Sequence, residues 1–191
     1  TRMTALEHYG GGIELYKHYS ELLEFADVDA VMIGLPPNLT DDASIAAVGA
    51  GKHVFVEPPV GNETLAVTVP LRTVFHVDLE LRYLPVVAKM REIVYSGCLG
   101  RLLQVSVELE SDWSMNDQVN DPFQASTVFG LGNWYIDLLD IFMGSEAVRV
   151  DIFGNYPKNP AHMEMGTAIV QYADGAIGKW VFNLRVGRKF H

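Results

Sequence analysis

The sequence predicts an α/β protein in which a partial parallel sheet is followed by an α+β domain with a largely antiparallel open sheet. Two apolar runs, at 30–35 and 53–57, flank a helical segment in the first part. A strand, a helix and a second strand joined by short connections indicate parallel strands with a right-handed crossover. In the second part, apolar and polar residues alternate at 103–110, 148–152 and 180–184, which is typical of strands with one wet face.

Elements of the first part follow from local signals. The run at 30–35 is continuous and ends in two prolines, which favours a strand buried on both faces. Thr40 is a suitable N-cap for the helix that follows. Gly51 is placed to end that helix, because glycine readily adopts the left-handed conformation of a C-terminal cap.

The second part begins with a helix that Pro85 opens and Gly97 ends. Asp174-Gly175 lies between two alternating runs, which is a strong hairpin signal. We place the boundary between the two parts near 75–81, which gives domains at 1–78 and 79–191.

Composition excludes several classes of function. The chain has 191 residues, a net charge of -10 and 49% hydrophobic residues. It can therefore bury a core, and its acidity argues against binding nucleic acid or a membrane surface. Cys98 is the only cysteine, which fits a reducing compartment, so we expect a cytoplasmic protein. No apolar run reaches the ~20 residues needed to span a bilayer, and the histidine spacing predicts no metal site.

Four segments together resemble the Gfo/Idh/MocA family of nicotinamide-dependent oxidoreductases. They are Ile33-Gly34-Leu35-Pro36-Pro37-Asn38, Gly51-Lys52-His53-Val54-Phe55-Val56-Glu57, Arg82-Tyr83-Leu84-Pro85 and the stretch at 132–144. The resemblance implies a partial Rossmann domain at 1–78 and the family's C-terminal α/β domain at 79–191. It also implies NAD or NADP as cofactor, and hydride transfer to or from a sugar, polyol or related small hydroxy compound.

The resemblance also assigns candidate site residues. On the nicotinamide side they are Leu35, Pro36, Asn38 and Glu57, although Glu57 could equally be a structural carboxylate.

On the substrate side the resemblance assigns Arg82 and Trp134. The indole of Trp134 could stack on a ring or lie in the core. Asp137 is the candidate catalytic residue, and if buried it needs a partner. Asp140, three residues further on, could share its helix face, or both could face solvent.

Three departures from the family pattern open an alternative. Pro58 stands at the lysine of the usual Glu-Lys-Pro, Trp134 at the acid–base histidine, and Gly130 at an aspartate. The alternative is a non-catalytic relative used for ligand sensing or protein association. In either case the exposed face of the second sheet could pair subunits, so we expect a homodimer or homotetramer through the C-terminal sheet.

A further expectation concerns the glycine-rich dinucleotide fingerprint, which should precede Thr1. We therefore expect the sequence to be a piece of a longer protein. The three glycines at 10–12 follow a helical segment, so we interpret them as a surface loop, with a phosphate cradle as the alternative.

Overall fold

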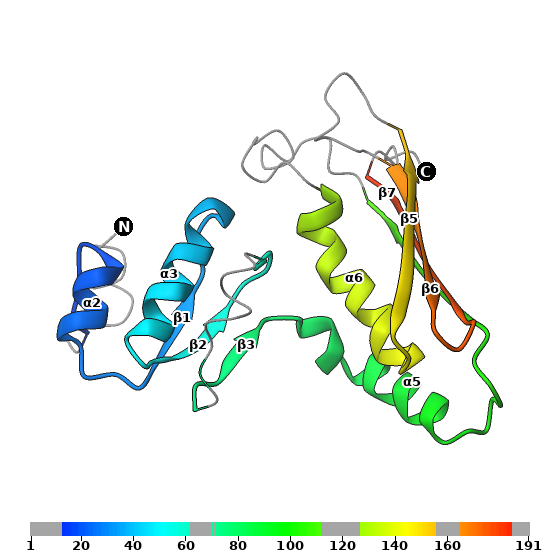
Figure 1. Ribbon diagram of the computed structural model, residues 1–191, viewed down its shortest axis with the longest axis horizontal. Coiled ribbons are helices and arrows are strands. Elements are labelled where there is room, and N and C mark those ends of the chain that lie inside the picture. The colour runs from blue at the N-terminus through cyan, green and yellow to red at the C-terminus, as the bar shows by residue number, and fades with distance from the viewer. Residues whose placement is uncertain (1–12, 62–69, 71, 112–126, 156–164, 185–191) are drawn as a thin grey trace, which may run out of the picture. The chain divides into compact units, whose positions relative to one another are not determined.

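A computed structural model describes residues 13–61, 70, 72–111, 127–155 and 165–184 (Figure 1). The chain divides into two compact units. Unit 1 reaches to Val77 without 36–38, and unit 2 comprises 36–38 together with the chain from Asp78 onward. The assignment of 1–78 and 79–191 as two domains stays a prediction.

Unit 1 contains a three-stranded parallel sheet in the order β1-β2-β3. Its elements are α2 (Tyr19–Phe25), β1 (Ala30–Ile33), α3 (Pro37–Gly49), β2 (His53–Val56) and β3 (Phe75–Val77). In register, Ile33 lies beside Val56, and Val56 beside Val77. The parallel pairing predicted for the first two strands is confirmed.

One face of this sheet forms the core of unit 1. Side chains from all three strands and from α3 pack together there: Ile33, Val54, Val56, Ala43, Ala47 and Val48, with Val31, Phe75 and Val77 at the margin. The opposite face carries Met32, which is 81% exposed, and the stacked rings of Phe55 and His76. The expectation that the strand at 30–35 is buried on both faces is therefore wrong, because no described element covers the face of Met32.

The helix α3 begins four residues earlier than expected, since an N-cap at Thr40 would make residue 41 its first residue. Pro37 is its first residue, and the fixed φ of proline suits the first helical turn. Thr40 consequently lies inside the helix rather than capping it; it is buried, and its Oγ1 donates to the carbonyl oxygen of Leu35 at 3.1 Å. The expected C-terminal signal is present, since Gly51 has φ +73° and its N–H donates to Val48 O at 2.9 Å.

Unit 2 places helices beside a four-stranded sheet in the order β4-β7-β6-β5. Its elements are η1 (a 3-10 turn, Glu80–Tyr83), α5 (Pro85–Tyr95), β4 (Gln104–Glu110), α6 (Thr127–Met143), β5 (Ala147–Gly154), β6 (Met165–Tyr172) and β7 (Ile177–Asn183). The pairs β5–β6 and β6–β7 are antiparallel, and β4–β7 is parallel. The predicted fold class is confirmed.

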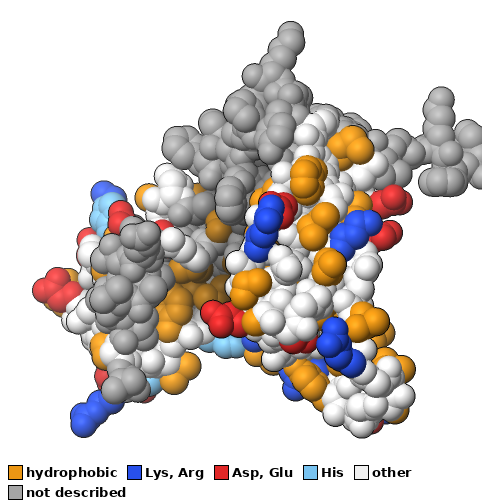
Figure 2. Space-filling view, turned by 45° about the vertical axis from the view of Figure 1, so that its right-hand side comes forward, with side chains coloured by type: hydrophobic (Ala, Val, Ile, Leu, Met, Phe, Trp, Pro, Cys, Tyr) orange, Lys and Arg blue, Asp and Glu red, His pale blue; other side chains and the backbone are white. Residues whose placement is uncertain are grey.

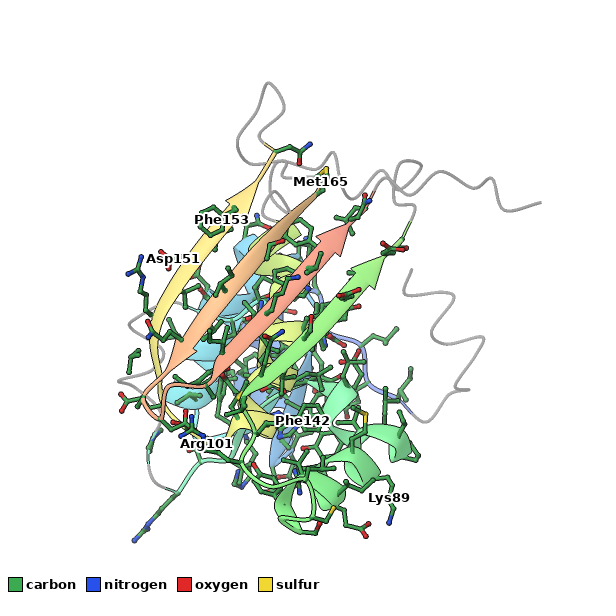
Figure 3. The ribbon with its side chains drawn as sticks, turned by 90° about the vertical axis from the view of Figure 1, so that its right-hand side faces the viewer. Lys89, Arg101, Phe142, Asp151, Phe153 and Met165 are labelled. Carbon is green, nitrogen blue, oxygen red and sulfur yellow. The ribbon has the colours of Figure 1, made fainter. Side chains whose placement is uncertain are left out.

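The core of unit 2 lies between α6 and one face of the sheet. Its buried side chains include Leu139, Ala168, Val170, Tyr172, Trp180, Phe182 and Leu184. Gly132 allows the close approach of α6, because a Cβ there would lie 3.1 Å from Cζ3 of Trp180. Figure 3 shows the other face of the sheet toward the viewer, with no described helix in front of it.

The strand β5 differs from its three neighbours. Val150 and Ile152 lie opposite Val170 and Ala168 of β6, on the core face, yet they are 52% and 38% exposed. The helix α6 packs mainly against β4 and β7, and β5 is the outermost strand of the described sheet, beyond β6. The predicted alternation is present in its sequence, but its apolar face is only partly covered.

Candidate functional site

The predicted nicotinamide-side residues lie where the parallel strands of unit 1 end. Leu35 and Pro36 follow β1, Asn38 lies in the first turn of α3, and Glu57 follows β2 directly. The N–H of Glu57 donates to Ile33 O at 3.1 Å, which holds the ends of β1 and β2 together. Leu35, Pro36, Asn38 and Glu57 are all exposed, so this edge presents its groups to solvent.

The end of β1 has open space beside it. Gly34 has no atom within 4 Å of where a Cβ would lie, so the space beside the end of β1 is open. The thirteen-residue helix α3 starts three residues later, and ligands of open α/β sheets bind at such carboxyl ends. Glu57 and Asn38 bring a carboxylate and an amide to this edge.

A cavity of about 250 Å³ lies between α2, β1 and α3. Apart from the phenol of Tyr19, its lining is apolar or backbone: Tyr19, Leu22, Leu23, Val31, Met32, Ile33, Gly34, Leu35, Ala43 and Ala47. It offers van der Waals contact rather than acid–base chemistry. No sequence pattern indicates this cavity, because its walls come from three separate elements.

In unit 2 the predicted residues Arg82 and Asp137 form a bidentate ion pair. Arg82 Nε donates to Asp137 Oδ2 at 2.5 Å, and Arg82 Nη2 donates to Asp137 Oδ1. Asp137 is 8% exposed, whereas the Arg82 side chain is 41% exposed. Hydrogen bonding to Asp137 raises the pKa of Arg82 above its ordinary value, so the guanidinium stays charged. The partner that a buried acid requires is therefore supplied by η1.

Trp134 contacts the same turn. Its Nε1 donates to the Oε2 of Glu80, an exposed carboxylate, and the side chain of Trp134 is half-buried. Trp134 is therefore not a fully buried core residue, while its stacking on a ligand stays a prediction. Glu80 was missed from the sequence. Glu80 and Arg82 lie two residues apart in η1, and their partners Trp134 and Asp137 lie three residues apart in α6. This correspondence can be recognised only once the two elements are known to touch.

A second acidic residue of this helix, Asp140, is bound by the sheet. The hydroxyl of Tyr172 donates to Asp140 Oδ1 at 2.7 Å. Burial of Tyr172, followed by this hydrogen bond, raises the pKa of its hydroxyl. Asp137 and Asp140 therefore take partners from different elements, and the alternative in which both face only solvent does not hold.

Both oxygens of the Asp137 carboxylate accept hydrogen bonds from Arg82, so this carboxylate holds the guanidinium in place. Pro58 is buried and has no ionisable group at the position of the family's lysine. Arg82, in contrast, uses two of its five N–H donors on Asp137, and its remaining donors lie on a partly exposed side chain.

Among the residues that the structure describes, no three or more His, Cys, Asp or Glu side chains are grouped so that they could hold a metal ion. Within the same ranges no helix is both long and apolar enough to cross a membrane. The glycines at 10–12, the candidate phosphate cradle, lie outside the described residues.

Comparison with known proteins gives matches over both parts of the chain. The family model described as "Oxidoreductase family, NAD-binding Rossmann fold" matches residues 7–80. A second, described as "GFO/IDH/MocA C-terminal domain", matches residues 87–189. The chain belongs to the Gfo/Idh/MocA family of oxidoreductases. The recognition of this family, and of an NAD-binding Rossmann domain within it, is confirmed.

Two relatives within the Gfo/Idh/MocA family are longer than this chain. Levoglucosan dehydrogenase of Pseudarthrobacter phenanthrenivorans is 30% identical over 84% of this chain and 50% of its own length. Glucose-fructose oxidoreductase domain-containing protein 1 of Mus musculus is 28% identical over 68% of this chain and 36% of its own. The chain thus spans about a third to a half of these relatives.

Solved structures of Gfo/Idh/MocA dehydrogenases share the fold. A probable dehydrogenase from Thermotoga maritima superposes with a TM-score of 0.83 at 20% identity, over 96% of this chain and 58% of that one. The WlbA dehydrogenase of Bordetella pertussis, in complex with NADH and UDP-GlcNAcA, gives 0.84 at 18% identity, over 97% and 57%. At these identities the likeness concerns the fold alone.

Proposed function

We propose that the protein of which this chain is part is an NAD(P)-dependent oxidoreductase acting on a sugar, polyol or related small hydroxy compound. One observation carries the proposal. The chain joins the NAD-binding family domain to a C-terminal domain in which a charged, partly exposed arginine is held rigidly by a buried aspartate. Such a side chain suits the orientation of a hydroxylated molecule.

The nicotinamide side is assigned to the strand ends of unit 1. Leu35 and Pro36 provide backbone and apolar contact there, and Asn38 and Glu57 provide polar groups. When bound, NAD(P) supplies the hydride acceptor or donor. The residues of the chain would hold its ribose and amide and exclude water around them.

The substrate side is assigned to Arg82 and Trp134. The charge of Arg82 is balanced by Asp137, so the pair together carries no net charge. A neutral pair with spare N–H donors favours neutral hydroxyl groups over carboxylates or phosphates. The flat face of the half-buried Trp134 would pack against the apolar side of a sugar or polyol.

Asp137 would contribute chiefly by fixing Arg82. The direct polar role predicted for it as a catalytic residue stays part of the proposal, but its bidentate engagement favours positioning. Substitution by asparagine separates the two roles. Loss of positioning raises KM for the substrate, whereas loss of a proton acceptor lowers kcat and changes its pH profile.

A specific observation favours the second candidate, a non-catalytic relative that senses a ligand. Pro58 is buried where the family has a lysine, and the Trp134 N–H is engaged by Glu80 where the family has a histidine. Neither position can relay a proton. A sensor would bind the cofactor or the polyol without turnover.

The test is a titration of the full-length protein with NADH and with NADPH, followed by tryptophan emission, and then turnover on a panel of sugars and polyols. We expect binding below about 1 mM and turnover of at least one neutral compound. Absence of binding by both cofactors contradicts the proposal, and binding without turnover selects the sensor.

A matched pair of variants ties the result to the site. Arg82→Met should keep cofactor binding and lose substrate binding. Arg101→Met removes another exposed arginine of unit 2 (Figure 3) and should change neither. Equal effects of the two variants would remove Arg82 from the site.

Two further assignments belong to this proposal. We place the protein in the cytoplasm, from its single cysteine, and we expect self-association into a dimer or tetramer through the sheet of unit 2. Figure 2 shows hydrophobic side chains interspersed with charged ones over this unit. Sedimentation of the full-length protein at several concentrations tests the association.

A further inference from the structure

The indole of Trp134 is held by a carboxylate that belongs to another element. Its Nε1 donates to the Oε2 of Glu80, an exposed residue of η1. The bond joins α6 to η1, since the two residues are 54 positions apart in the chain. The orientation of this indole therefore depends on where the turn η1 lies.

The turn that carries Glu80 is itself fixed at the next two residues. Leu81 packs against a buried apolar cluster that α5 and α6 share. Arg82 forms the bidentate pair with Asp137, and its own backbone N–H donates to Leu79 O at 3.1 Å. Apolar packing and an ion pair thus hold the residues that follow Glu80, so its carboxylate is presented to α6 from a fixed backbone.

The helix α6 directs Trp134 toward η1 and not toward the sheet. On another face of this helix, Gly132 and Tyr135 lie against Trp180 of β7, and the two rings stack with centroids 6.0 Å apart. Residues three apart share a helix face, so Trp134 shares one with Asp137, and both bind residues of η1. The half-buried indole thus lies beside the ion pair that the proposed function assigns to the substrate side.

A tryptophan at such a place does not set the plane of its own ring. The torsion about the Cβ–Cγ bond is broad and roughly two-fold, so the backbone and χ1 alone leave several ring orientations open. A hydrogen bond at Nε1, which lies at one edge of the indole, selects one of them. The carboxylate makes this selection strong, because a charged acceptor binds an N–H more tightly than a neutral one.

We propose that Glu80 is a positioning residue of the substrate side. By accepting from Trp134 Nε1, it sets the plane of the indole against which the bound compound packs. Arg82, two residues further along the same turn, offers its remaining N–H donors to hydroxyl groups. One turn thereby fixes both the flat surface and the donor. The inference rests on the proposed function and adds to it a residue that does not itself touch the substrate.

Two substitutions in the full-length protein separate the hydrogen bond from other roles of Glu80. Glu80→Leu removes the acceptor and frees the indole. KM for the neutral compound with the highest turnover should then rise about three- to tenfold, the size of one aromatic packing contact, while kcat changes less than about twofold. Glu80→Gln removes the charge but keeps a carbonyl acceptor, so KM should stay within about twofold of the wild-type value.

A double-mutant cycle with Trp134→Phe shows whether Glu80 acts through the indole. Phenylalanine keeps a flat ring but has no N–H, so Glu80 has nothing to orient in that background. Trp134→Phe alone should raise KM much as Glu80→Leu does, and the double variant should raise it no further. A merely structural role of Glu80 would instead add its cost in both backgrounds.

Tryptophan anisotropy tests the positioning without any ligand. The contribution of Trp134 is the difference between each protein and the same protein carrying Trp134→Phe. This contribution should fall in Glu80→Leu, because the freed ring moves more, and it should be unchanged in Glu80→Gln. Glu92→Leu is the matched control. Glu92 is another exposed glutamate of unit 2, paired with Lys89, and its replacement should change neither KM nor anisotropy.

Three results would overturn the inference. An unchanged KM in Glu80→Leu, with turnover intact, removes Glu80 from the substrate side and leaves the proposed function standing. Additive effects of Glu80→Leu and Trp134→Phe assign independent roles to the two side chains. If the protein binds no cofactor and no compound of the panel, the proposed function and the inference are both wrong. If it binds a compound without turnover, the dissociation constant replaces KM in each comparison.

Discussion

The two sheets both pack one face against a helix, but the covering helices are fixed in different ways. In unit 1, α3 lies on its sheet through small side chains, Ala43, Ala47 and Val48. In unit 2, α6 packs on large side chains such as Trp180 and is also tied by side-chain pairs to η1 and β6. One helix is held mainly by close apolar contact, the other by apolar contact together with directed polar bonds.

The opposite faces differ as well. The uncovered face of unit 1 bears Met32, Phe55 and His76, whereas β4 in unit 2 turns polar residues such as Ser106 and Glu108 to the open side. Alternation of apolar and polar residues therefore indicates a strand with one face exposed to water in the folded chain. A continuous apolar run indicates a strand whose two faces are both suited to burial, whether or not a described element covers them.

The largest loss of stability should follow from replacing Trp180, the side chain against which α6 packs. Trp180 is fully buried, and its ring stacks on Phe182 with centroids 4.7 Å apart and on Tyr135 with centroids 6.0 Å apart. Trp180→Ala should lower the free energy of unfolding by about 3–5 kcal/mol, measured by urea denaturation with circular dichroism. Val56→Ala, in the core of unit 1, should cost about 2 kcal/mol. An equal or larger cost at Val56 would break the contrast between the two cores.

The second effect concerns the tie between α6 and η1. Asp137→Asn should lower the free energy of unfolding by about 1–3 kcal/mol, because it removes the charge that Arg82 binds. A double-mutant cycle with Arg82→Met should give a coupling energy above about 1 kcal/mol. The exposed pair Lys89–Glu92 is the control, and its coupling should be about 0.5 kcal/mol or less. Similar couplings for the two pairs would show that the tie contributes no more than a surface ion pair.

The third effect depends on pH. Burial and the hydrogen bond to Asp140 raise the pKa of Tyr172 above its ordinary value of 10.0. Above pH 10 the unfolded chain loses this proton while the folded protein retains it. Stability is therefore complete below about pH 10 and falls as pH rises further, by at most about 1.4 kcal/mol per pH unit. Tyr172→Phe should make that fall shallower in urea denaturation between pH 9 and 11.

Tyr135 limits the size of that change, because burial raises its pKa as well and the Tyr172→Phe variant retains it. An unchanged alkaline slope in the variant would show that Tyr172 does not contribute. In that case the bond from Tyr172 to Asp140 is not part of what holds α6.

The smallest effect should be found on the uncovered face of unit 1. Met32→Gln replaces a side chain that is 81% exposed, so the free energy of unfolding should change by less than about 0.5 kcal/mol. A loss above about 1 kcal/mol would mean that this face is covered in the complete protein. The two sheets would then differ clearly, because this face of unit 1 would be buried while the open face of unit 2 is exposed to water.

The sequence was sufficient for the fold class, because strand pairing direction and hairpins depend on local patterns. The parallel β1–β2 pair, the Asp174-Gly175 turn with Gly175 at φ +86°, and the buried set on β7 all follow from such patterns. The start of α3 was misplaced because two signals competed. Proline at the first helical position prevailed over a threonine cap, and the Thr40 hydroxyl then bonded back to Leu35.

The candidate site was predicted less completely. The sequence named Arg82, Trp134 and Asp137, but not that Arg82 and Asp137 bind each other or that Glu80 binds Trp134. These contacts join residues about 55 positions apart, so no local periodicity reports them. The resemblance brought the right segments to notice, whereas the pairing of charges within them needed three-dimensional placement.

Gly132 has a consequence for what family membership can tell us. The family's pattern in this helix is an aspartate, a glycine, a histidine and an aspartate at the positions of Gly130, Gly132, Trp134 and Asp137, so this chain retains the glycine and the second aspartate. A Cβ at Gly132 would meet the ring of Trp180. The other, Asp137, is bound to Arg82. Both retained positions thus secure architecture, while the positions altered to Gly130 and Trp134 are those the resemblance links to chemistry. Family membership therefore reports how this helix fits the sheet, independently of the residues at the two altered positions.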